Sequence, residues 1–278
     1  MENLKVKIQE AVNLYKSGNL IKCEELTKNL IKKNPKVVFL HNLLGMVLSA
    51  LNKPEEAEKS YNQGIQVDPN FAIIYNNLAL IYYNKISIAT PGRDFQLNVK
   101  KAEELFKKSL MTNSKLAEPN TNLGNLYSLI GKNDESIKYH KLAISADPKY
   151  YYSYLNIANV QVSIGNFDEA KKYLNKAIIQ NPNFSFAHRL LSRLTKYTNE
   201  DHHLIQLKKL YENINPNDNM NKMNLGFALG KANEDIKNYD ESFKYYKTAN
   251  TINRSKINFS LKKEENYFNE IKKTYNER

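Results

Sequence analysis

Tryptophan is absent from the 278 residues, and cysteine occurs once, as Cys23. A single cysteine excludes an intramolecular disulfide and fits a reducing compartment such as the cytoplasm. Nine glycines and eight prolines are few, which argues against a turn-rich all-β chain and for long helices. The most apolar stretch, residues 43–51, is too short to span a bilayer, and the first ten residues contain no apolar signal core. The sequence therefore predicts a helical, cytoplasmic protein without a membrane span.

The charge balance is basic, with 41 Lys and Arg against 29 Asp and Glu and a net charge of +12. Such a balance can favour nucleic acid or anionic membranes as partners. Lysine supplies 36 of the 41 cations, asparagine occurs 39 times, and both have A-rich codons, so an AT-rich genome accounts for much of this bias. The lysines are also scattered as singles or pairs. We therefore expect neither nucleic acid nor a membrane as the partner.

Prolines recur at a fixed interval, because 34 residues separate Pro35 from Pro69, Pro148 from Pro182, and Pro182 from Pro216. A small residue stands 24 positions before each proline: Ala11, Gly45, Gly124, Ala158, Ser192. Another usually stands 12 positions before it: Cys23, Ala57, Ser136, Ala170. Small residues let two antiparallel helices approach closely, and a proline ends the second helix. The period predicts a stacked array of helix pairs.

Three segments carry a family resemblance: LGMVLSALNKPEEAEKSYNQGIQVDP (residues 44–69), LGNLYSLIGKNDESIKYHKLAISADP (residues 123–148) and IANVQVSIGNFDEAKKYLNKAIIQNP (residues 157–182). They resemble the tetratricopeptide repeat (TPR) family. The resemblance implies an all-α, right-handed TPR solenoid of about seven helix pairs with a C-terminal capping helix. It also implies that a protein or peptide partner binds in the concave groove of the solenoid. The oligomeric state is left open.

The repeat array is expected to cover residues 1–254, and residues 255–278 are expected to form a capping or linker helix. The third repeat carries 11 extra residues near 89–98, which we expect to interrupt the helices, either as a plain surface loop or as a lip over the groove. The sixth repeat, residues 184–216, has Leu204 and Tyr211 where other repeats have small residues. Its two helices are therefore expected to lie further apart.

Asparagines recur beside the small residue of the first helix in successive repeats. Asn77, Asn122 and Asn156 lie two positions before it, and Asn125 and Asn159 lie one position after it. Equivalent positions of stacked first helices line up, and an amide offers one acceptor and two donors to a peptide backbone. The TPR family, including the nucleocytoplasmic glycosyltransferases, is known for such asparagine-lined grooves. These five residues are the candidate peptide-binding site.

This binding hypothesis and its alternative differ in where the amides point. Amides that serve a ligand are expected to face the concave channel without intramolecular partners. In the alternative, the asparagines bridge neighbouring repeats or cap helices, and the high asparagine content makes coincidence a real possibility. Removing them would then lower the melting temperature.

No arrangement of residues predicts catalysis. The five histidines lack the helical spacing of a zinc enzyme, and Cys23 occupies a small-residue position typical of a buried, unreactive thiol. We therefore expect no catalytic residue, no metal site and no cofactor in this chain. The function that follows is a non-catalytic interaction scaffold.

The last third supports a second hypothesis by resemblance. FALGKANEDIKNYDESFKYYKTAN (residues 227–250) and HRLLSRLTKYT (residues 188–198) look like the junction of bacterial proteins in which a TPR array precedes a sulfotransferase domain. That resemblance implies a substrate-recruiting half whose catalytic domain lies beyond Arg278. No strand with a phosphate-binding loop occurs before that residue.

Overall fold

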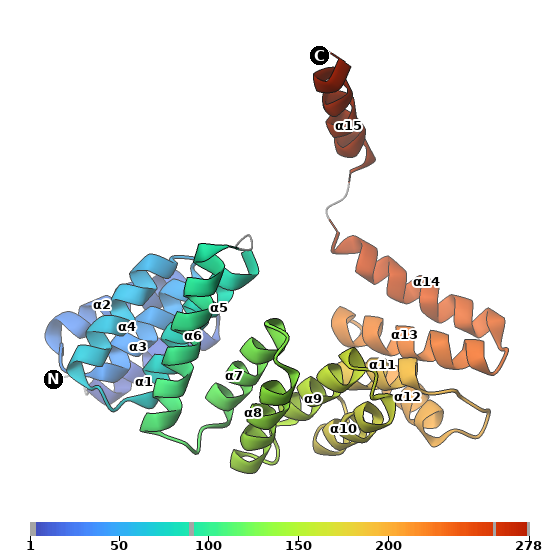
Figure 1. The fold of residues 1–278 in the computed structure, drawn as a ribbon, viewed down its shortest axis with the longest axis horizontal. Helices are drawn as coiled ribbons and strands as arrows, with labels where there is room; N and C mark the ends of the chain where they lie inside the picture. The colour runs from blue at the N-terminus through green and yellow to red at the C-terminus, as the bar shows by residue number, and fades with distance from the viewer. Residues whose placement is uncertain (1–3, 89–91, 258–259, 277–278) are drawn as a thin grey trace. The chain divides into compact units, whose positions relative to one another are not determined.

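The computed structural model describes residues 4–88, 92–257 and 260–276. Within these ranges the chain forms fifteen α-helices and no strand (Figure 1). The helices are α1 (Leu4–Lys16), α2 (Leu20–Lys33), α3 (Val38–Ala50), α4 (Pro54–Val67), α5 (Ala72–Ile88), α6 (Arg93–Thr112), α7 (Ala117–Leu129), α8 (Asn133–Ala146), α9 (Tyr151–Ser163), α10 (Phe167–Gln180), α11 (Ser185–Leu194), α12 (His202–Glu212), α13 (Asn219–Asp235), α14 (Tyr239–Ser255) and α15 (Leu261–Asn276). The predicted all-α fold is confirmed.

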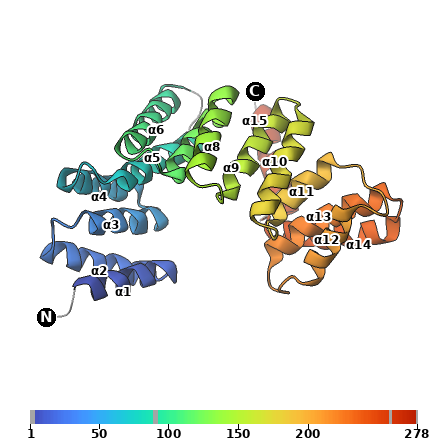
Figure 2. The ribbon, with the colours of Figure 1, turned by 90° about the horizontal axis from the view of Figure 1, so that it is seen from below.

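The chain divides into two compact units, residues 1–166 and 167–278, called unit 1 and unit 2. In unit 1, α1 packs with α2, α3 with α4, α5 with α6, and α7 with α8. The first helices of successive pairs also touch one another, from α1 through α3, α5 and α7 to α9. Figure 2 shows α1, α3 and α5 following one another along this unit. This side-by-side arrangement of first helices carries the candidate site.

Each pair reverses direction at a tight turn that the sequence marks. Gly18, Gly131 and Gly165 have φ angles of 75°, 75° and 83°, in the left-handed region that glycine adopts at little cost. Asn52 occupies the corresponding turn of the second repeat with φ of 58°. The prolines follow the ends of second helices, so the predicted punctuation of the repeats is confirmed.

Small residues allow the two helices of a pair to pack closely. The ring of His140 lies so near Gly124 that a Cβ there would be 2.7 Å from the ring carbon Cε1. In the next repeat Ala158 and Leu174 stand at these two positions, and both are fully buried. In the pairs α3–α4 and α7–α8, one small residue therefore packs against one large residue, Gly45 against Tyr61 and Gly124 against His140.

The third repeat uses its extra residues to lengthen both helices. Helix α5 has 17 residues and α6 has 20, whereas α3 has 13 and α4 has 14. The expected interruption over residues 89–98 is therefore wrong for residues 93–98, which form the first turns of α6. Phe95 packs on the core of unit 1 and Val99 is buried within it, so apolar burial extends the helix. Residues 89–91 lie outside the described part.

Unit 2 begins with α10 and includes the sixth repeat, whose helices α11 and α12 were expected to lie further apart. Helix α11 packs against α10 and α13, and α12 packs against α13. Leu204 of α12 is 1% exposed and forms a cluster with Tyr197 of the preceding loop. The bulky residue at the small-residue position thus packs in an apolar cluster that α12 forms with α13.

The predicted terminal helix is present as α15. Its large apolar residues Leu261, Tyr267, Phe268 and Tyr275 are all exposed. Which surface this helix covers, and with it the division into residues 1–254 and 255–278, stays a prediction. Across the described ranges, every helix is too short or too polar to cross a membrane.

Candidate functional site

Asparagine side chains link the first helices of unit 1 in sequence. Asn77 on α5 donates from Nδ2 to Oδ1 of Asn42 on α3 at 2.9 Å. Asn122 on α7 donates to Oδ1 of Asn76 on α5 at 3.0 Å. Asn156 on α9 donates to Oδ1 of Asn125 on α7 at 2.8 Å. The three hydrogen bonds link four successive first helices, and we call these six residues the asparagine ladder.

The ladder corrects one expectation from the sequence. Under the binding hypothesis, Asn77, Asn122 and Asn156 were expected to lack intramolecular partners, and each instead donates to a neighbouring repeat. The physical reason is that stacking brings equivalent positions of adjacent helices within hydrogen-bond distance, and half-buried amides pair rather than stay unsatisfied. Bridging of repeats, the alternative considered for these residues, is therefore part of their role.

The amides retain hydrogen-bonding capacity after these contacts. An amide has two N–H donors and an oxygen that accepts twice, and a ladder contact uses only one of these. Among the described residues, Oδ1 of Asn122, Oδ1 of Asn156 and Nδ2 of Asn125 have no intramolecular hydrogen bond. Asn159 is exposed and has no hydrogen-bond partner in the same ranges. These groups are left for a ligand or water.

One end of the ladder borders an open groove. A cavity of about 640 Å³ is lined by Asn77 together with Leu80, Lys85, Met46 and Glu118, from helices α3, α5 and α7. Its floor is mainly apolar, whereas Lys85 and Glu118 place opposite charges at its edge. Such a mixture of apolar surface and a few polar groups suits a peptide segment.

A repeated contact lies at the start of four first helices, α3, α5, α9 and α11. The carbonyl oxygen of the repeat proline accepts a hydrogen bond from the side chain six residues later. Tyr75 donates to Pro69 at 3.0 Å, and Tyr154 donates to Pro148 at 3.2 Å. His41 and His188 make the same contact through Nε2, each at 2.9 Å, to the carbonyls of Pro35 and Pro182. Three of these helices, α3, α5 and α9, also carry ladder residues.

Tyrosine–glutamate pairs join each second helix to the following first helix. Tyr82 donates to Glu58 at 2.5 Å, and Tyr127 donates to Glu103 at 2.8 Å. Burial, reinforced by the hydrogen bond to the Glu103 carboxylate, raises the pKa of Tyr127 to about 12. Burial and the adjacent Glu58 likewise raise the pKa of Tyr82. Both tyrosines stay neutral donors and lock neighbouring repeats together.

In unit 2, two histidines form a directional chain of hydrogen bonds. A carbonyl only accepts, so His188 donates from Nε2 to Pro182 and accepts at Nδ1 from Nε2 of His203, at 2.8 Å. Nδ1 of His203 then accepts from the hydroxyl of Tyr197 at 2.7 Å. Burial, followed by the proximity of His188, lowers the pKa of His203 to about 4. Both rings are neutral structural elements between α11 and α12.

Side chains that could bind a metal ion or act as a nucleophile are few in the described ranges. There, no three His, Cys, Asp or Glu side chains gather to hold a metal ion. Cys23 is fully buried, its Sγ lies 3.1 Å from the carbonyl oxygen of Ala11, and burial raises the pKa of its thiol. The prediction of a buried cysteine is confirmed, and a thiol with a raised pKa is a poor nucleophile.

Sequence reasoning identified four of the six ladder residues, namely Asn77, Asn122, Asn125 and Asn156. Asn42 and Asn76 were missed, although both lie three positions before the small residue of their helix, Gly45 and Ala79. That shared position is a signal equal to the one used for Asn77. The sequence does not show that an asparagine two positions before the small residue contacts one three positions before it in the preceding repeat. That contact depends on how the repeats stack.

Comparison with protein families matches three parts of the chain to the same repeat. Residues 45–85 match a model described as TPR repeat, and residues 131–194 and 227–256 match models described as tetratricopeptide repeat. All three are models of repeats alone and give no support to the resemblance to sulfotransferase-linked arrays.

Solved structures with this fold come from several bacterial proteins. A thermophilic TPR protein of Thermus thermophilus is 19% identical, with a TM-score of 0.60, over 69% of this chain and 98% of that one. PilF of Pseudomonas aeruginosa is 17% identical, with a TM-score of 0.60, over 76% and 93%. PilW, described as a widely conserved type IV pilus biogenesis factor, is 16% identical, with a TM-score of 0.59, over 91% and 99%. Identities this low show the fold alone.

A curated relative matches a shorter region. The uncharacterized protein ycf37 of Pyropia yezoensis is 31% identical over 85 residues, which are 31% of this chain and 42% of that protein. The chain thus matches less than half the length of this relative. The three family matches, the repeat period and the stacked helix pairs nevertheless agree on one assignment. Residues 45–85, 131–194 and 227–256 of this chain are therefore tetratricopeptide repeats.

Proposed function

We propose that this TPR protein is a non-catalytic interaction scaffold that binds an extended peptide segment of a partner protein along its asparagine ladder. TPR arrays serve as protein–protein interaction scaffolds, and the ladder gives this one a specific surface. The observation that carries the proposal is the spare capacity of the ladder amides: Asn122, Asn125 and Asn156 each retain a donor or acceptor. A peptide main chain offers alternating N–H and C=O groups that such amides can bind.

The ladder contacts also favour binding by pre-organisation. An asparagine held by a neighbouring asparagine has lost part of its rotamer freedom before a ligand arrives, so binding costs less conformational entropy. The groove beside Asn77 adds apolar contact from Met46 and Leu80. Binding should therefore combine main-chain hydrogen bonds along the ladder with one or two apolar side chains at its end.

The test begins with the full chain and a displayed library of short linear peptides. A selected peptide is then synthesised in two forms, one with alternate backbone nitrogens methylated and one with its polar side chains replaced by alanine. Main-chain recognition predicts that methylation abolishes binding in calorimetric titration and that alanine replacement leaves most of it. The reverse pattern would show side-chain recognition and reject the role given to the ladder.

A further inference from the structure

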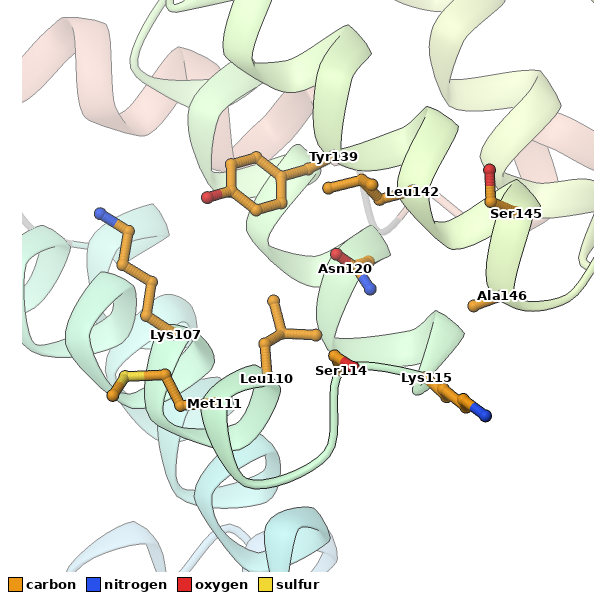
Figure 3. A pocket seen from close by; sticks show the side chains of 10 residues that line it. All are labelled: Lys107, Leu110, Met111, Ser114, Lys115, Asn120, Tyr139, Leu142, Ser145 and Ala146. Carbon is orange, nitrogen blue, oxygen red and sulfur yellow. The ribbon is translucent and has the colours of Figure 1, made fainter.

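A second surface lies on the second helices, away from the ladder residues. A pocket of about 620 Å³ opens between α6 and α8, beside the start of α7 (Figure 3). Leu110 and Met111 line it from α6, and Tyr139 and Leu142 line it from α8. The lining residues of α6 and of α8 each follow one another at helical spacing, so the pocket is a groove along two helices. We call it the α6–α8 groove.

The apolar residues of this groove are exposed where the neighbouring repeat is polar. Met111 is 81% exposed and Leu142 is 44% exposed. Met111 follows the buried Phe106 by five positions, and the residue five positions after the equivalent Tyr61 is Gln66. Leu142 follows His140 by two positions, and the residue two positions after Phe106 is Lys108. The apolar pair is thus a feature of this groove and not of the repeat in general.

Lysines border the apolar surface. Lys107 and Lys115 line the groove. Lys107 is 46% exposed and pairs with Glu103 at 2.5 Å, whereas Lys115 is exposed and has no ion-pair partner among the described residues. The chain as a whole carries a net charge of +12. An apolar floor with cationic edges complements a ligand that is apolar on one face and acidic beside it.

We propose that the α6–α8 groove binds an acidic amphipathic helix of a partner protein. Leu or Ile residues on one face of that helix contact Leu110, Met111 and Leu142, and its flanking carboxylates lie near Lys107 and Lys115. A helix fits because the groove runs along two parallel rows of side chains, as in other helix-in-groove complexes. This surface is independent of the ladder and gives the scaffold a second docking site.

The test uses a fluorescent, helix-stabilised peptide of about 16 residues, roughly 24 Å long, with leucines along one face and glutamates beside them. A second peptide carries lysine at every glutamate position. Titrations by fluorescence anisotropy compare the full chain with the double variant Met111→Gln and Leu142→Lys, which makes this groove resemble the preceding repeat. Ile179→Gln is the matched control, because Ile179 is a 71% exposed apolar residue on α10.

We expect saturable binding of the acidic peptide, no binding of the basic peptide, and a loss of about tenfold or more in the double variant. Lys115→Glu in the native chain should weaken binding of the acidic peptide, and more strongly at low salt than at high salt. Ile179→Gln should leave binding unchanged. Asn122→Ala should also leave it unchanged, which separates this site from the ladder. Absence of saturable binding, equal binding of both peptides, or loss only in Asn122→Ala would overturn the proposal. Conversion of a dimer to a monomer by the double variant would assign the groove to a second copy instead and would also overturn it.

Discussion

The side-chain amide of Asn122 donates a hydrogen bond of 3.0 Å to the side-chain oxygen of Asn76 on the neighbouring first helix. Asn76 is 2% exposed, so the contact is sheltered from water on one side and open on the other. A sheltered amide pair stabilises the stacking of repeats, and the outward half of Asn122 stays available to a ligand. One residue type therefore contributes to both stability and recognition.

Because the ladder hydrogen bonds stabilise the stacking of repeats, removing one of them should lower the stability of the protein. Asn156→Ala removes the 2.8 Å hydrogen bond to Asn125 and should lower the free energy of unfolding by about 1 kcal/mol. Asn159→Ala, one turn away and exposed, should change it by less than about 0.5 kcal/mol. Urea unfolding followed by circular dichroism measures both. Equal effects of the two substitutions would show that the ladder contact does not stabilise the array.

The close packing of Gly124 on His140 predicts a cost and a rescue. Gly124→Ala places a Cβ about 2.7 Å from the ring and should destabilise the fourth repeat by roughly 1–3 kcal/mol. Adding His140→Leu gives the alanine and leucine that the next repeat has at the equivalent positions, Ala158 and Leu174. The double variant should recover most of the loss in thermal unfolding. If the double variant were as unstable as Gly124→Ala alone, the destabilisation would not arise from a clash with the His140 ring.

Buried histidines predict a loss of stability in mild acid. Burial lowers the pKa of His140 from 6.5 to about 4, and neither of its ring nitrogens has a hydrogen-bond partner among the described residues. Between these values the unfolded chain binds more protons, so the stability is fully present above pH 6.5 and is lost as the pH falls towards 4. The loss from this residue between pH 7 and pH 5 is about 2 kcal/mol.

His140→Leu should flatten this pH dependence, and unfolding measured at both pH values provides the check. His203 adds a similar contribution in unit 2, where it faces Tyr197, His188 and Asp201, so the variant should retain part of the slope. An unchanged slope in His140→Leu would show that this histidine does not titrate as its burial implies.

The proline contacts predict a small, specific effect of removing one hydroxyl. Tyr75→Phe leaves the carbonyl of Pro69 without its 3.0 Å donor and should cost about 0.5–1.5 kcal/mol of stability. Tyr239→Phe is the control, because Tyr239 is 64% exposed. Denaturant midpoints compare the two. A Tyr75→Phe variant as stable as the control would show that the contact is incidental.

The repeat register predicted the helix pairs because small residues such as Gly45 and Gly124 report close packing directly. It failed at the insertion because the Pro91-Gly92 sequence predicts a break in helical periodicity, whereas α6 begins at Arg93, where Phe95 packs on the core and Val99 is buried. Helix-breaking residues in the sequence do not show which neighbouring apolar side chains pack into the core of the folded protein.

The sequence predicted most of the residues that belong to the candidate site but not which side chains they contact. Repeat arithmetic places Asn122 and Asn156 on equivalent faces, but the partners Asn76 and Asn125 depend on the rotation between successive repeats. That rotation arises from packing of whole helices. The α6–α8 groove was missed for the same reason, since Met111 and Leu142 lie 31 residues apart in the sequence.

The most direct test of the proposed function is a calorimetric titration of one selected peptide into the native chain and Asn159→Ala. Asn159 has no hydrogen-bond partner among the described residues, so its removal leaves the fold intact and takes away only a group offered to a ligand. The account predicts unchanged thermal unfolding and binding weaker by about fivefold to tenfold, equivalent to one lost hydrogen bond. Unchanged affinity in Asn159→Ala, together with unchanged affinity in Asn122→Ala, would contradict it.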